Sequence, residues 1–252
     1  MSFDRVHLSE EKLIAAIGDN WPPAQVDAAV ELLSNSDGKF PTGVRKLPSD
    51  LVSAVQRERL IAAMLRAASE LGYRAANVQD VIERAGVSRP TFYEHFGNKE
   101  ACFLSAFDIT AKRLRDRVAA AAEKGGEDWH KRLRFGLETL LHFVATEPEA
   151  ARTLIVEARA ASVEAVLRRD ALLDHFATCI DAQVRTHYPE APAHSPITAA
   201  GIVGGCEALL YSRLNKGELD DLDSLLPSMM YFLVLPYDGH EVASKELAVT
   251  LR

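Results

Sequence analysis

The stretch that decides the fold is Val78–Lys99, VQDVIERAGVSRPTFYEHFGNK. Apolar residues recur in its first part at the spacing of one helix face: Val78, Val81, Ile82 and Ala85. This pattern predicts a short helix that runs up to Gly86, because glycine leaves helical dihedral angles most readily. Ser88 then offers a hydroxyl to the free N–H groups of a second helix, and Pro90 suits the first turn of that helix, where no N–H is missed.

Two short helices joined by a tight turn form a helix-turn-helix, whose second helix has the right size to lie in the major groove of DNA. Within that second helix, Phe92 and Phe96 are four residues apart and are expected to face inward. Only residues that point outward can touch bases or phosphates. The sequence therefore predicts a DNA-reading surface on the side of the helix opposite the two phenylalanines.

The surrounding run closely resembles the DNA-binding domain of TetR-type transcriptional repressors: Arg57–Phe103, RERLIAAMLRAASELGYRAANVQDVIERAGVSRPTFYEHFGNKEACF. The resemblance rests on Gly-Tyr, then AGVS, then TFYEHF and NKE at a fixed interval, over roughly a fifth of the chain. It implies an all-α protein with an N-terminal three-helix helix-turn-helix domain. A larger helical domain that binds an effector and dimerises would follow.

The resemblance also implies that the first turn of the second helix meets base edges through Arg89, Pro90 and Thr91. The chemistry agrees, because arginine can bind O6 and N7 of guanine together, and threonine can bond a base or contact a thymine methyl. Phosphate contacts would come from Tyr93, His95 and Lys99.

Two capping residues complete the predicted DNA-binding set. Ser88 is expected to start the second helix, and Asn77 is well placed to cap the first one. The amide or backbone N–H of Asn77 could also hold a phosphate. For each residue of the set, a surface or local capping role is the alternative to a DNA contact.

The chain is divided into an N-terminal extension with a basic linker (residues 1–44), a helix-turn-helix domain (45–100) and a helical effector-binding and dimerisation domain (101–252). The extension is expected to form a small helical pair, packed on the main body or serving as an extra surface for a partner. Arg45 and Lys46 precede the first DNA-binding helix, where a basic arm can follow the minor groove. A solvated loop is the equally weighted alternative.

The charge is unevenly distributed along the chain. The net charge is −7, although nucleic-acid binders are usually basic. Residues 41–125 nevertheless carry 14 Lys and Arg against 10 Asp and Glu, so the positive charge lies with the helix-turn-helix. The acidic remainder keeps the protein soluble and weakens indiscriminate attachment to DNA.

The rest of the chain reads as helices separated by Pro, Gly or acidic breaks, and no alternating β pattern appears. The predicted class is therefore all-α. Helices are expected at 49–71, 78–85, 98–123, 127–145, 148–160, 162–187, 195–216 and 222–235. In the first of them, five residues share the face expected to be buried: Leu60, Met64, Ala67, Ala68 and Leu71.

Two segments near the C-terminus resemble the helix pair that forms a four-helix dimer interface in TetR-type proteins. One helix carries small residues along a face: Ala200, Gly201, Gly204, Gly205 and Ala208. The other, residues 225–235, is apolar nearly all round. An ordinary monomer core is the alternative, but a helix-turn-helix normally needs two copies to read two half-sites. A homodimer is therefore predicted.

An effector pocket is expected among the middle helices, because aromatic walls with a few polar groups suit a small molecule. The effector itself is not named by the sequence. The candidate lining residues are Trp129, Phe135, His142, Phe143, Glu157, His175, Phe176 and Cys179. For each of them, a place in the core or at the surface is the alternative.

Other classes of protein find little support. Cys102, Cys179 and Cys206 are widely separated, without CxxC or a nearby His pair, so no disulfide framework, metal site or cofactor is indicated. The charged N-terminus lacks an apolar h-region, and the longest apolar run (229–235) is too short to span a bilayer, which favours a cytoplasmic protein. An enzyme is not expected, because no nucleophile elbow, phosphate loop, HExxH or paired-carboxylate motif is present.

The sequence thus predicts a dimeric, sequence-specific transcriptional regulator, most often a repressor by resemblance, that leaves a palindromic operator when a small-molecule effector binds. Activation, and a regulator that senses no ligand, are left open. The alternative from another class is a helical protein-interaction module, with an acidic N-terminal extension as its binding surface and DNA binding secondary.

Overall fold

The computed structural model describes residues 49–189, 195 and 197–248. The predicted N-terminal extension, together with Arg45 and Lys46, lies outside the described residues. Within them the secondary structure is helical and contains no β-strand, so the predicted all-α class is confirmed. The chain forms two compact units, and the boundary between them falls between Ala106 and Phe107.

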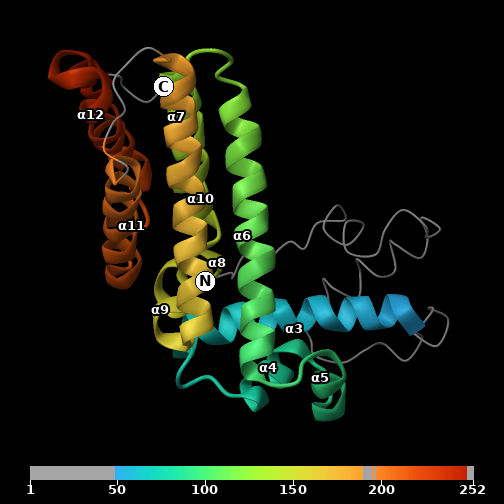
Figure 1. The fold of residues 1–252 in the computed structure, drawn as a ribbon. Helices are drawn as coiled ribbons and strands as arrows, with labels where there is room; N and C mark the ends of the chain where they lie inside the picture. The colour runs from blue at the N-terminus through green and yellow to red at the C-terminus, as the bar shows by residue number, and fades with distance from the viewer. Residues whose placement is uncertain (1–48, 190–194, 196, 249–252) are drawn as a thin grey trace. The chain divides into compact units, whose positions relative to one another are not determined.

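The first unit is built from α3 (Ser49–Leu71), α4 (Val78–Ala85), α5 (Arg89–His95) and the first two turns of α6 (Lys99–Glu123). Helix α3 braces the other two, because both α4 and α5 pack against it (Figure 1). Four of the five residues on its predicted buried face are fully buried, namely Leu60, Met64, Ala67 and Ala68. The fifth, Leu71, is 43% exposed because it occupies the last position of the helix, where fewer neighbours cover it.

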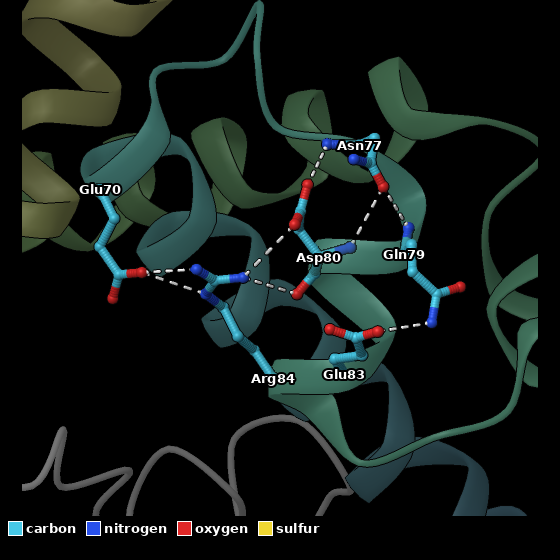
Figure 2. A network of polar contacts seen from close by, with 6 residues as sticks. All are labelled: Glu70, Asn77, Gln79, Asp80, Glu83 and Arg84. Carbon is cyan, nitrogen blue, oxygen red and sulfur yellow. Dashed lines mark hydrogen bonds and ion pairs between the residues drawn. The ribbon is translucent and has the colours of Figure 1, made fainter.

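A polar network ties α4 to α3. The guanidinium of Arg84 donates to Oε2 of Glu70 from both Nε (3.2 Å) and Nη2 (2.6 Å). Its Nη1 donates to the carbonyl of Asp80, one turn back on α4 (Figure 2). One side chain therefore fixes the orientation of α4 on α3.

Among the described residues, the second unit contains the rest of α6, four long helices and four short helical segments. These are α7 (Trp129–Thr146), α8 (Pro148–Arg152), η2 (Thr153–Glu157), α9 (Ala158–Ala161), α10 (Val163–His187), α11 (Thr198–Lys216), η3 (Leu222–Leu225) and α12 (Leu226–Leu247). In Figure 1, α6, α7 and α10 run lengthwise beside one another, and α11 lies beside α12. Residues of α6, α7, α10 and α11 line a common cavity, so these four helices surround the interior of the unit.

The segment 148–160, expected as one helix, is interrupted. Its middle, η2, is a π-helical stretch between the short α-helices α8 and α9. A π-helical turn inserts an extra residue and shifts the side chains that follow it around the helix. As a result Leu154 and Ile155 face the cavity, while Glu157 is buried and lies 3.5 Å from Arg152.

Helix α12 continues beyond the predicted end at Leu235. It contains Pro236, and it bends at Gly239, whose φ of 77° is open to glycine at little cost. His130 on α7 holds both sides of this bend, with Nε2 2.6 Å from Oδ2 of Asp238 and Nδ1 3.0 Å from Oε1 of Glu246. The predicted end at Leu235 is therefore wrong: the helix continues through Pro236 and a kink at Gly239, where His130 of α7 contacts residues beyond the proline.

Within the described residues, no helix is long and apolar enough to cross a membrane. The same residues contain no group of three or more His, Cys, Asp or Glu that could hold a metal ion. Cys102 and Cys206 are buried, and burial raises the pKa of the Cys102 thiol to about 12 and that of the Cys206 thiol to about 11.

Candidate nucleic-acid interface and effector cavity

The first helix of the motif begins at a capping box. Oδ1 of Asn77 accepts hydrogen bonds from the backbone N–H groups of Gln79 (2.8 Å) and Asp80 (3.3 Å). In return, the Asp80 carboxylate accepts from the backbone N–H of Asn77 at 2.8 Å (Figure 2). The predicted cap is therefore confirmed, and Asn77 itself is exposed. The arrangement satisfies N–H groups that would otherwise lack partners at the helix start.

The turn and the start of α5 also form as predicted. Gly86 ends α4 with a φ of 64°, in the left-handed region that favours glycine. The backbone N–H of Thr91 donates to Oγ of Ser88 at 3.2 Å, and Pro90 lies in the first turn of α5. The hydroxyls of Ser88 and Thr91 are 2.8 Å apart, so both side chains are held at the exposed end of the helix.

Helix α5 has one buried and one exposed face. Phe92 is fully buried and Phe96 is 4% exposed, which confirms that both rings face inward. The side chains of Arg89 and Pro90 are exposed, and Tyr93 is 49% exposed with its ring edge against Phe92. The buried rings of Phe92 and Phe96 thus hold α5 against the rest of the unit, and the first turn of α5 remains exposed.

A hydrogen-bonded chain leads from α4 to Arg89. Nη2 of Arg89 donates to Oε1 of Gln79 at 3.1 Å, and Nε2 of Gln79 donates to Oε1 of Glu83 at 2.7 Å. Figure 2 shows Gln79 and Glu83 side by side on α4. The guanidinium of Arg89 is therefore oriented by a neighbouring helix and keeps further N–H groups for another acceptor.

Lys99 makes contacts that the sequence did not reveal. Its Nζ donates to the backbone carbonyls of Tyr73 (2.8 Å) and Ala76 (2.7 Å), and it lies 4.1 Å from the centre of the Tyr73 ring. Partial burial lowers the pKa of the ammonium group. Two of its three N–H groups are thus used to fasten the loop between α3 and α4 to the start of α6.

His95 is half-buried, and its Nε2 is a buried atom without a hydrogen-bond partner. Burial lowers the pKa of its imidazole; the charge of Glu94 opposes this change, and the charge of Arg57 adds to it. The neutral ring is therefore favoured more than in an exposed histidine. Any phosphate contact of His95 at neutral pH would be a hydrogen bond from an uncharged ring.

The second unit contains a cavity of about 150 Å³ with mostly apolar walls. Three of the eight predicted effector residues line it: Phe143, Phe176 and Cys179. The other five lie outside its lining. Trp129 is buried in an aromatic cluster with His187 and Tyr188, Glu157 pairs with Arg152, and three are at least partly exposed, namely Phe135, His142 and His175.

Five polar residues of these two sites were not predicted from the sequence. Gln79 contacts Arg89, and the other four line the cavity, namely Arg132, Arg169, Gln183 and Glu207. The signal for Gln183 was present, because Leu172, Phe176 and Gln183 recur at helical spacing on α10, so one polar residue stands on an apolar stripe.

The match to a known family falls within the first unit. Residues 60–106 match the family described as bacterial regulatory proteins, tetR family. The HTH-type transcriptional activator FasR of Mycolicibacterium smegmatis is 28% identical over 116 residues, 46% of this chain and 52% of that protein. The HTH-type transcriptional regulator EthR of the same organism is 37% identical over 76 residues, 30% of this chain and 35% of that protein. The chain thus spans about half or less of the length of these relatives.

Solved structures resemble more of the chain. The fatty acid degradation regulator FadR from Bacillus halodurans superposes with a TM-score of 0.63 at 21% identity, covering 70% of this chain and 97% of that one. FadR from Bacillus subtilis, solved in complex with stearoyl-CoA, gives a TM-score of 0.63 at 19% identity, covering 72% and 98%. At these identities the likeness concerns the fold.

Proposed function

The chain belongs to the TetR family by its DNA-binding domain, residues 60–106, and we propose that it is a dimeric transcriptional repressor that leaves a palindromic operator when a small-molecule effector binds. The observation that carries the proposal is the exposed first turn of α5, anchored from behind by the buried rings of Phe92 and Phe96. The protein acts in the cytoplasm on double-stranded DNA and has no catalytic role.

Base recognition is assigned to the exposed first turn of α5. Arg89 reads a guanine through O6 and N7, and Thr91 contacts a neighbouring base, with Pro90 packed against the base edges. The bond from Arg89 to Gln79 supports this assignment, because a guanidinium held in one direction loses less freedom on binding. Ser88 sets the position of Thr91 through its hydroxyl.

Phosphate contacts surround this turn. Asn77 and Tyr93 are exposed and carry polar groups that can reach the DNA backbone. Lys99 keeps one N–H for a phosphate oxygen, and His95 offers a neutral N–H. Arg45 and Lys46, outside the described residues, supply a basic arm for the minor groove.

A homodimer is assigned to the faces of α11 and α12. Leu209 is 48% exposed and Phe232 is 42% exposed, which is unusual for large apolar side chains on neighbouring helices. A Cβ added at Gly201 or Gly204 would meet no atom within 4 Å, so this face can accept a close partner helix. Gly205 is different, because a Cβ there would lie 2.9 Å from Cε1 of Phe232.

The cavity of the second unit is the proposed effector site, with Phe143, Phe176 and Cys179 among its walls. Its apolar lining fits a hydrophobic ligand, and stearoyl-CoA bound to the FadR of Bacillus subtilis supports a ligand that contains an acyl chain. The effector acts through its different affinities for the DNA-competent and DNA-incompetent arrangements, a coupling of about 1–3 kcal/mol. The relative FasR is named an activator, so the experiment must also distinguish repression from activation.

The test is a mobility-shift assay on the DNA upstream of the protein's own coding sequence, with and without heparin. A shift that survives heparin and is lost in Arg89→Ala supports sequence-specific binding. A shift abolished by heparin for the wild type would contradict it and favour the alternative, a protein-interaction module with secondary DNA binding. Transcription of a reporter from the same DNA then distinguishes a repressor from an activator.

A further inference from the structure

The cavity of the second unit is elongated. Its lining on α10 extends from Arg169 to Gln183, over which a helix rises about 21 Å at 1.5 Å per residue. On α7 the lining extends from Arg132 to Phe143, and α6 contributes residues from Leu114 onward. These three helices run lengthwise together in Figure 1, so the cavity follows their common direction.

The two ends of the cavity can be assigned from the topology. Helix α10 runs antiparallel to α7, because the ring of Trp129, at the start of α7, lies 6.2 Å from that of His187, at the end of α10. Gln183 and Arg132 therefore line one end, beside the turn from α6 to α7. Arg169 lies toward the opposite end.

The polar groups near Arg169 satisfy one another. Nη2 of Arg169 lies 2.8 Å from Oε1 of Glu207, and Nη2 of Arg159 lies 2.5 Å from the other oxygen of the same carboxylate. Glu207 is buried and shared between two guanidinium groups. Because these charged groups already bind one another, the surface that remains for a ligand at this end is the apolar wall, which suits a hydrocarbon terminus.

The end at Gln183 is different. Oε1 of Gln183 is a buried atom without a hydrogen-bond partner, and it belongs to a side chain that lines the cavity. An unsatisfied buried acceptor is costly and rare in folded proteins. Arg132, the charged side chain that lines the same end, donates from Nη1 to the carbonyl of Gly126 at 3.3 Å. Oε1 of Gln183 is therefore an unpaired hydrogen-bond acceptor in a mostly apolar wall of the cavity.

We propose that the effector is a chain-shaped amphiphile bound lengthwise, with its hydrocarbon end toward Arg169 and with an O–H or N–H donor on Oε1 of Gln183. The inference rests on the proposed function, which assigns an effector with a hydrocarbon chain to this cavity, and it adds the orientation of that chain, the chemistry of its polar end and the residue that selects it. An ionised carboxylate has no donor for Oε1, so any affinity that it gains at this end comes from the guanidinium of Arg132 and not from Gln183. An ester with the same hydrocarbon chain contacts the same apolar walls but leaves Oε1 of Gln183 without a donor.

The experiment compares four probes with one chain length: decanol and decanamide, which carry donors, and methyl decanoate and decanoate, which do not. Dissociation constants are measured by calorimetry on the full chain. We expect decanol and decanamide to bind about tenfold more tightly than methyl decanoate, because each forms one net hydrogen bond that the ester cannot form. In Gln183→Met this ratio falls to about one while the ester binds as before, because the apolar walls remain.

Arg185→Met is the matched control, because Arg185 lies on the same helix but is exposed and does not line the cavity. It should keep the wild-type ratio. A ratio unchanged in Gln183→Met, a preference for decanoate that depends on Gln183, or no binding of any probe would overturn the inference. If the donors bind through Gln183 and DNA affinity does not change, the effector role in the proposed function fails while the assignment of the site stands.

Discussion

The guanidinium of Arg89 donates to Oε1 of Gln79 at 3.1 Å, across the turn that separates α5 from α4. Gln79 is itself held by Glu83, so the direction of Arg89 depends on a helix that need not touch the bases. The orientations of Arg89 and Gln79 are therefore coupled.

The coupling between these residues is open to a double-mutant cycle. Arg89→Ala should reduce discrimination at one base pair by about 1–3 kcal/mol, whereas Gln79→Met should cost less because it only frees the guanidinium. Adding Gln79→Met to Arg89→Ala should cost nothing further in discrimination. Competition titrations with operator variants measure the three values, and strictly additive losses would contradict the positioning role.

Thr91→Ala should relax preference at a different base pair by about 1–3 kcal/mol. Affinity for random DNA should be retained, because phosphate contacts supply most of nonspecific binding. The same competition titrations apply, with Thr91→Ser as the control that keeps the hydroxyl near Ser88. Equal weakening on all sequences would show that Thr91 does not read a base.

Lys99→Met should have two separable effects. Loss of two hydrogen bonds from a charged donor to the carbonyls of Tyr73 and Ala76 should lower the free energy of unfolding by about 1–3 kcal/mol, measured by urea denaturation. Loss of a phosphate contact should flatten the salt dependence of DNA binding by about one unit. An unchanged salt slope with reduced stability would make Lys99 a purely structural residue.

His95 should make stability fall on mild acidification. Burial lowers its pKa in the folded protein, so below the ordinary value of about 6.5 the unfolded chain binds the proton first, and folding weakens as pH falls toward the folded pKa. In His95→Gln the loss of melting temperature between about pH 7 and pH 5.5 should be smaller than in the wild type. His142→Gln, at an exposed position, is the control. Identical profiles for His95→Gln and the wild type would refute this account.

The dimer assignment predicts that Leu209→Glu converts the protein to a monomer at micromolar concentration, because a charge at the core of an interface lacks a partner. Leu167→Glu, which replaces a leucine that is 58% exposed on α10, should leave the assembly unchanged. Sedimentation velocity distinguishes the two. A monomeric wild type would contradict the dimer at once.

The DNA-binding helices were predictable because their signals are local. Gly86, Ser88 and Pro90 act within a few residues of their own positions, and the spacing of Phe92 and Phe96 identifies the buried face. Helix capping and hydrophobic periodicity depend only on residues that are close together in the sequence. The structure therefore agrees with the sequence there in detail.

What escaped prediction depends on distant parts of the chain. The carbonyls that bind Lys99 come from a loop more than 20 residues earlier, and α12 continues past Pro236 because His130 holds Asp238 and Glu246. For the cavity proposed to bind the effector, composition identified aromatic residues but could not show that Trp129 belongs to a separate cluster. Long-range contacts of this kind override local signals.

The central claim is that the first turn of α5 reads DNA as part of a symmetric dimer. Selection of bound sequences from random DNA, carried out in parallel with the wild type and Arg89→Ala, tests it most directly. We predict a palindromic consensus for the wild type, with half-sites about one helical turn apart or a multiple of that spacing, and an altered or degenerate base in each half-site for Arg89→Ala. No enrichment, or the same consensus for both proteins, would contradict the claim.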